Sequence, residues 1–238
     1  MKKNQFKLYP ALMLTLLTAL FACNKDFDTK IPEKEYSDSV NIAFGTPKVI
    51  LLIADGARGV SVRDARAPIM TALLPHAIYS WNALGDDEIE EKGTNWADLM
   101  TGVQKDKHGV IGNDFSGNKF EAYPLLFKRI KTARPTAKIV SFASTAAFNQ
   151  NVADGADLKQ NAANDDAVKA AIVNSLQNDT ASLIVGQFKE IDQAGANEGY
   201  DISKTSYKNA ILKFDTAVGE ILNALKDRPE YESENWLW

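Results

Sequence analysis

The sequence predicts an α/β fold with a doubly wound, mainly parallel sheet sandwiched between helices. Continuous apolar runs, typical of strands buried on both faces of a sheet, alternate with segments of helical period. The runs occupy 48–54, 138–142 and 181–188. Strands alternating with helices of this length imply right-handed crossovers between parallel strands. We therefore expect a ligand site at the carboxyl ends of the strands.

Amphipathic segments between and after these strands account for the covering helices. Apolar residues recur on one stripe in 123–132 and 165–176, and the longest such segment is 204–226, which Pro229 follows. The last residues, 234–238, predict one more strand. A buried strand is a poor place for a domain to end, so we expect the C-terminal part of the domain to be missing from this sequence.

Composition limits the classes of partner. With 238 residues and 45% hydrophobic content, the chain has enough apolar material for one sizeable core or for part of a larger one. The net charge is -4 and no segment gathers lysine and arginine into a stripe. Binding to a nucleic-acid polymer is therefore not expected, and a small or surface-bound ligand fits better.

The N-terminus predicts an exported, lipid-anchored protein. Residues 1–22 have the pattern of a lipoprotein signal peptide, with lysines before an apolar run too short to span a membrane comfortably. Cys23, the only cysteine, ends a Leu-Phe-Ala-Cys motif that resembles a lipobox, so we expect its lipidation; an incidental cysteine is the alternative. The polar residues 24–28 resemble a surface-export signal, which predicts an outer-membrane lipoprotein exposed at the cell surface. The charged stretch 23–46 is predicted to be a tether.

Asp55 is the first candidate site residue. It follows the strand 48–54 directly, with Gly56 allowing a sharp turn, so its carboxylate is expected at the carboxyl end of a central strand. A metal ligand is useful there, and capping of the following helix is the alternative.

A motif farther along resembles a known enzyme family. Thr101-Gly102, His108-Gly109-Val110 and Asn113 resemble the TG…HG…N signature that follows the nucleophile in type I phosphodiesterases and nucleotide pyrophosphatases of the alkaline phosphatase superfamily. Sulfatases have a similar TG…HG step. The resemblance extends over 48–238 and implies an alkaline-phosphatase-like phosphodiesterase domain, here partial, at 47–238. It also implies two divalent metal ions, usually zinc, and a hydroxyl nucleophile at a helix N-terminus.

The same resemblance assigns roles to individual residues. Asp55 and Asp192 match two metal-ligand aspartates, and Asn113 matches an asparagine that contacts phosphate oxygens. The ungapped nucleophile position falls on Lys92, which has no hydroxyl. Thr94 is the nearest candidate nucleophile, and it could instead cap a helix that begins near Trp96.

The sequence departs from the family pattern at positions that the chemistry needs. Ala196 stands where the family's D-x-x-G-H motif has its histidine, and Asn197 is an imperfect substitute. His76 and His108 are the only histidines; His76 has no ligand partner in sequence, and His108 is predicted to be structural. Two open metal sites need about three protein ligands each. Metal binding and hydrolysis are therefore expected to be weak or absent in this chain.

Two functions remain open at this stage. The first is a metal-dependent hydrolase of phosphate esters, or less readily of sulfate esters. The second is a non-catalytic surface lipoprotein that keeps the fold and captures glycans or nutrients. Lys92 is relevant to both functions, because a cation near the amides of a helix N-terminus can bind an anion. The commoner role of a lysine in an acidic run such as 86–92 is to be solvated at the surface.

Overall fold

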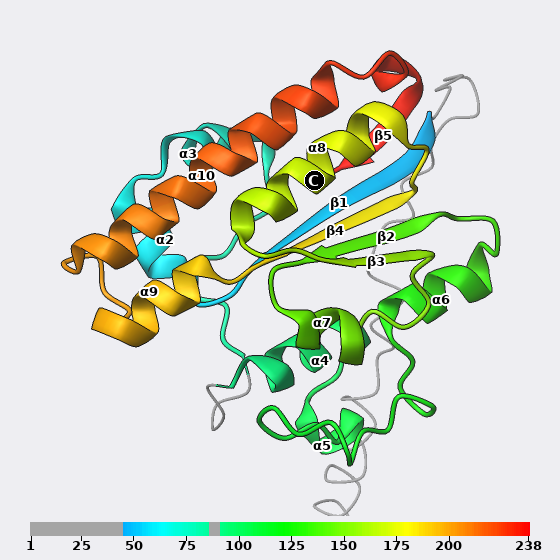
Figure 1. Ribbon diagram of the computed structural model, residues 1–238, viewed down its shortest axis with the longest axis horizontal. Helices are drawn as coiled ribbons and strands as arrows, with labels where there is room; N and C mark the ends of the chain where they lie inside the picture. The colour runs from blue at the N-terminus through cyan, green and yellow to red at the C-terminus, as the bar shows by residue number, and fades with distance from the viewer. Residues whose placement is uncertain (1–44, 86–90) are drawn as a thin grey trace, which may run out of the picture. The chain divides into compact units, whose positions relative to one another are not determined.

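The computed structural model describes residues 45–85 and 91–238, which form one α/β unit (Figure 1). Within these residues a sheet of five strands has the order β3-β2-β4-β1-β5, and every pairing is parallel. The strands are β1 (Thr46–Ala54), β2 (Ile139–Ala143), β3 (Leu158–Asn161), β4 (Leu183–Phe188) and β5 (Glu234–Leu237). The predicted fold class is confirmed.

Helices cover both faces of the sheet, as Figure 1 shows. One face carries α8 (Asp165–Asn178) and α10 (Thr205–Lys226), and the other carries α4 (Lys92–Thr101), α6 (Leu126–Ala133) and α7 (Ala146–Asn151). The shorter helices are α2 (Gly59–Ala65), α3 (Pro68–Leu73), α5 (Lys105–His108) and α9 (Glu190–Glu198).

Side chains alternate between these two faces along each central strand. In β4, Ile184 and Phe188 pack beneath α8 and α10, whereas Leu183 and Val185 pack against the opposite helices. All four are at most 3% exposed. This two-sided burial explains why the strand reads as an unbroken apolar run in the sequence.

The short strand β5 is held against β1 by a buried ion cluster. Register pairs Thr46 with Glu234 and Val49 with Leu237. Glu234 accepts from Arg228 Nε at 2.9 Å and lies 3.2 Å from Lys48 Nζ. Burial raises the pKa of Glu234, but its hydrogen bonds, led by that from Arg228, outweigh burial and lower the pKa to about 2.

The structure differs from the sequence-based prediction at two elements, and other predictions fall on residues that it does not describe. The helix expected from Trp96 begins four residues earlier, at Lys92, and β3 was not predicted. The signal peptide 1–22, Cys23, the tether up to residue 44 and residues 86–90 of the acidic run lie outside the described residues. In the part of the chain that the structure describes, no helix is both long and apolar enough to cross a membrane.

Candidate functional site

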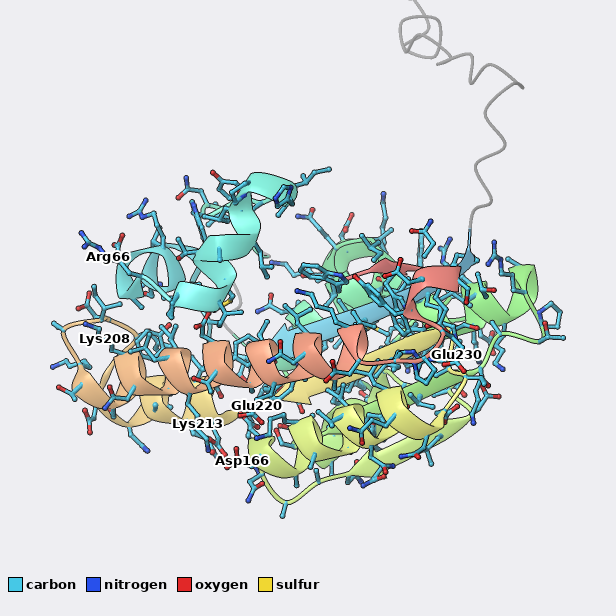
Figure 2. All side chains as sticks on the ribbon, turned by 90° about the horizontal axis from the view of Figure 1, so that it is seen from above. Arg66, Asp166, Lys208, Lys213, Glu220 and Glu230 are labelled. Carbon is cyan, nitrogen blue, oxygen red and sulfur yellow. The ribbon has the colours of Figure 1, made fainter. Side chains whose placement is uncertain are left out.

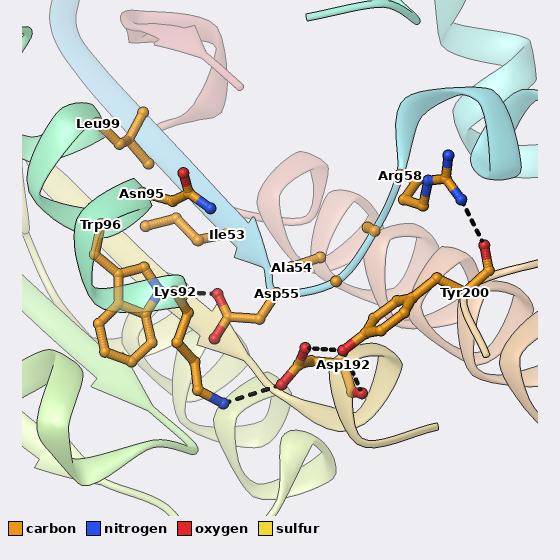
Figure 3. A pocket seen from close by; sticks show the side chains of 12 residues that line it. Ile53, Ala54, Asp55, Arg58, Lys92, Asn95, Trp96, Leu99, Asp192 and Tyr200 are labelled. Carbon is orange, nitrogen blue, oxygen red and sulfur yellow. Dashed lines mark hydrogen bonds and ion pairs between the residues drawn. The ribbon is translucent and has the colours of Figure 1, made fainter. Parts of the chain in front are cut away.

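A cavity of about 610 Å³ lies at the carboxyl end of β1, between α4 and α9 (Figure 3). Its walls include Asp55 and Asp192, together with Lys92, Trp96 and Tyr200. Volumes of this order suit small molecules. The two aspartates singled out by sequence therefore face one cavity, as expected from the parallel sheet.

Asp55 is fixed by the end of the sheet. Its backbone N–H donates to Phe188 O at 2.9 Å, which extends the β1–β4 pairing by one residue. The residue is 8% exposed; its carboxylate Oδ1 accepts from Trp96 Nε1 at 2.8 Å and Oδ2 accepts from Gln187 Nε2 at 2.7 Å. Burial raises the pKa of Asp55 from 3.8 to about 6, although both hydrogen bonds oppose the rise.

Asp192 enters the cavity from the first turn of α9. Lys92 Nζ donates to Asp192 Oδ2 at 3.0 Å, and the Tyr200 hydroxyl donates to Oδ1 at 2.7 Å (Figure 3). The Lys92 and Asp192 side chains are 37% and 23% exposed, so the ion pair borders the open cavity. A carboxylate in the first turn of a helix interacts favourably with the positive end of the helix dipole, so Asp192 also stabilises α9.

Gly56 allows the two aspartates to approach each other. Its φ of +76° lies in the left-handed region, and a Cβ there would come within 2.6 Å of Asp192 Cα. The Tyr207 hydroxyl donates to Gly56 O at 2.6 Å and fixes the same turn. The start of α9 can therefore pack directly against the loop after β1.

The structure does not bring Thr94 to the cavity. It is fully buried, and its hydroxyl lies 3.4 Å from Val110 O and 3.3 Å from Gly112 O. Because α4 begins at Lys92, with Glu91 as the N-cap residue, Thr94 is inside the helix and the prediction that it caps the helix is wrong. The hydroxyl predicted as nucleophile is thus separated from the two aspartates, and Lys92 faces the cavity instead.

Asn113 supports the beginning of α4 and is not among the residues that line the cavity. Its Oδ1 accepts from Gly93 N at 3.0 Å, and its Nδ2 donates to the Glu91 carboxylate. A Cβ on Gly93 would come within 2.6 Å of Gly112 O, so a glycine is needed where this loop meets the helix. Asn113 satisfies one of the backbone N–H groups that a helix leaves unpaired at its N-terminus.

His108 has the structural place predicted for it. It is fully buried; Nδ1 accepts from Val110 N at 3.0 Å, and Nε2 lies 2.7 Å from Asp98 Oδ1. The backbone contact leaves the proton on Nε2, which donates to the carboxylate. His76 is exposed and lies away from the cavity walls.

The donors around the two aspartates do not fit the divalent metal ions that the family resemblance implies. Lys92 Nζ already pairs with the Asp192 carboxylate, so a divalent ion bound there would meet an ammonium group at close range. No cluster of three or more histidine, cysteine, aspartate or glutamate side chains suitable for a metal occurs among residues 45–85 and 91–238. The arrangement is a hydrogen-bonded ion pair beside a buried acid.

Four cavity or support residues were not found from the sequence. Trp96, Gln187 and Tyr200 hold the aspartates, and Arg58 lines the cavity while its Nη1 donates to Tyr200 O at 3.0 Å. Gln187 carried a usable signal, because it is a polar residue at the end of an otherwise apolar strand. Tyr200 carried none, since it lies in a polar loop after α9.

Comparison with known proteins identifies the fold. No family model and no curated protein sequence matches the chain. Among solved structures, a 2-O GAG sulfatase matches with a TM-score of 0.61 and 12% identity, over 80% of this chain and 57% of that one. An inactive variant of murine ectonucleotide pyrophosphatase/phosphodiesterase 5, in complex with AMP, matches with a TM-score of 0.59 and 16% identity, over 80% and 55%. The phosphonoacetate hydrolase of Sinorhizobium meliloti, in complex with phosphonoformate, matches with a TM-score of 0.51 and 12% identity, over 75% of this chain and 54% of that one.

The chain has the fold of the alkaline phosphatase superfamily. Sequence identities this low establish the fold alone. This alkaline-phosphatase-like domain spans little more than half the length of the solved structures it matches. Its resemblance to that superfamily, inferred from the TG…HG…N residues, is confirmed at the level of fold, whereas the roles of individual site residues stay predictions.

Proposed function

We propose that this chain is an exported lipoprotein whose alkaline-phosphatase-like domain binds a phosphate or sulfate ester without hydrolysing it. The observation that carries the proposal is Lys92. It occupies the position that the family resemblance assigns to a hydroxyl nucleophile, and its ammonium group engages Asp192. Thr94, the serine or threonine nearest to Lys92 in the sequence, is buried and is not among the residues that line the cavity.

The cavity supports a ligand that has both an anionic group and an apolar or ring portion. Lys92 and Arg58 provide cationic groups, and Arg58 is exposed. Ile53, Trp96 and Leu99 provide apolar wall, with Leu99 49% exposed. AMP and phosphonoformate, the ligands named for two of the similar structures, each have an oxyanion.

Metal-dependent ester hydrolysis is the second candidate. It is favoured by the convergence of Asp55 and Asp192 on one cavity, which matches the placement of two metal ligands on separate elements. To act in this way, the site would have to displace the Lys92 ammonium group from Asp192 and obtain further ligands. We therefore place this function second.

Titration calorimetry and a hydrolysis assay on the full chain in detergent separate the two functions. AMP and p-nitrophenyl sulfate are the binding probes; bis(p-nitrophenyl) phosphate and p-nitrophenyl sulfate, with zinc or manganese, are the substrates. We expect saturable binding of at least one probe and no turnover above the protein-free rate. Turnover that both Asp55→Asn and EDTA abolish would establish the hydrolase instead.

A matched lysine substitution controls for general loss of positive charge. Lys208 lies on α10 (Figure 2), is exposed, and is not among the residues that line the cavity. Lys208→Ala should leave probe binding unchanged. Lys92→Ala should weaken it, because a charge-assisted contact to an oxyanion contributes about 1.5–3 kcal/mol.

A further inference from the structure

We infer that Lys92 is a resident cation that replaces a divalent metal ion in this site, so that the domain binds its oxyanion ligand independently of metal. This inference rests on the proposed function and specifies how the ligand is held. It is argued from the contacts of Lys92, the state of the two carboxylates, the charge inside the cavity and the position of Lys92 on its helix.

Protein donors hold both carboxylates, and one of the donors to Asp192 is itself a cation. Asp192 accepts from Lys92 at 3.0 Å and from Tyr200 at 2.7 Å. Asp55 accepts from Trp96 at 2.8 Å and from Gln187 at 2.7 Å. Trp96 and Gln187 are 3% and 0% exposed, so these donors are held by the core and cannot simply turn away.

The charges that border the cavity balance without a metal. With Asp55 ionised, two carboxylates, Asp55 and Asp192, face two cations, Lys92 and Arg58. A bare pair of carboxylates would need a divalent cation for neutrality, whereas this set does not. An added metal ion would instead meet the positive field of Lys92 at close range.

The position of Lys92 on α4 is unusual for a lysine. It is the first helical residue, where the positive end of the helix dipole disfavours a cation. The ion pair with Asp192 offsets that repulsion. An ammonium group has three donors, and Asp192 takes one of them. Within residues 45–85 and 91–238, Asp192 is its one hydrogen-bonded partner, and the side chain is 37% exposed at the cavity wall, so its other donors can face a ligand oxygen.

A lysine ammonium can thus hold an oxyanion but cannot activate a water molecule as a metal ion does. This agrees with binding in the absence of hydrolysis. It also predicts that Lys92 excludes metal from the site even when further ligands are offered. Both consequences can be measured on the same protein.

The first experiment compares zinc binding with and without Lys92. Asp192 and Ala196 are four residues apart on α9, so Ala196→His adds a ligand on the same helix face. We expect Lys92→Ala/Ala196→His to bind zinc at least tenfold more tightly than Ala196→His alone by calorimetry. Equal zinc affinity of the two variants would overturn the inference.

The second experiment measures the metal dependence of ligand binding. AMP and p-nitrophenyl sulfate are titrated into the full chain with EDTA or with zinc. The inference requires equal affinity in both conditions and at least a tenfold loss in Lys92→Ala, with substantial recovery in Lys92→Arg, which keeps the charge. Affinity that requires zinc, or that Lys92→Ala leaves intact in EDTA, would overturn it.

These two experiments fail in different ways. If neither probe binds the unsubstituted chain, the proposed function is wrong, and the zinc comparison still decides whether Lys92 excludes metal. Lys92→Gln, which preserves length and polarity, repeats each measurement if the alanine variant unfolds. The thermal unfolding midpoint of each variant, measured with and without EDTA, monitors folding independently.

Discussion

The protonation of Asp55 should make stability fall as the pH rises. Burial raises its pKa from 3.8 to about 6 in the folded chain, so the folded state binds this proton more tightly than the unfolded state. The resulting stabilisation is fully present below pH 3.8 and is lost as the pH rises through 6. A difference of about two pKa units corresponds to about 3 kcal/mol. About 2 kcal/mol of that should be lost between about pH 4.5 and 7.5.

Urea unfolding of the full chain, in EDTA, measures this loss. The difference in unfolding free energy between Asp55→Asn and the unsubstituted chain should change by about 2 kcal/mol between about pH 4.5 and 7.5, in favour of the variant at the higher pH. Asp227→Asn, which removes an exposed carboxylate, should show no such change. Parallel pH profiles for Asp55→Asn and the unsubstituted chain would refute the reasoning. An opposite trend would indicate that Asp55 is held as a carboxylate by a bound cation.

Three further predictions concern the rest of the chain. Glu234→Ala leaves Arg228 and Lys48 buried without their shared counter-ion. It should lower the free energy of unfolding, measured in urea, by about 3 kcal/mol. Glu232→Ala removes an exposed neighbouring carboxylate and should change the same quantity by less than about 0.5 kcal/mol. Because the folded pKa of Glu234 is lowered to about 2, its contribution should be present above pH 4.5 and disappear as the pH falls toward 2; a flat acid profile contradicts this. Cys23→Ser should abolish incorporation of labelled palmitate and move the protein from the membrane to the soluble fraction, and retention of the label would exclude lipidation at Cys23.

The sequence predicted the central strands because their burial leaves a direct trace in it. β1, β2 and β4 are covered on both faces, so each must be apolar at consecutive positions, and each was found within two residues of its bounds. β3 left no such trace. All four of its residues, Leu-Lys-Gln-Asn, are exposed at the edge of the sheet, so their side chains carry no pattern of burial.

The site was predictable only where topology alone determines position. Asp55 and Asp192 each follow a central strand, and parallel strands deliver such residues to one edge. The contacts of these residues depend on helix packing, which sequence spacing does not reveal. The helix start at Lys92, four residues earlier than expected, placed Thr94 inside α4 and brought the lysine to the cavity.

That displacement has a physical consequence for the site. If α4 began near Trp96, Lys92 would belong to the preceding loop and nothing would direct its ammonium group toward Asp192. With the helix beginning at Lys92, the hydrogen bond from Gly93 N to Asn113 Oδ1 fixes the first turn. The lysine side chain then starts from a defined position, and its Nζ lies 3.0 Å from Asp192 Oδ2. The same turn buries Thr94 against the loop that ends at Asn113. One packing arrangement therefore removes the hydroxyl from the cavity and supplies the cation, which is why the two departures from a hydrolytic site occur together.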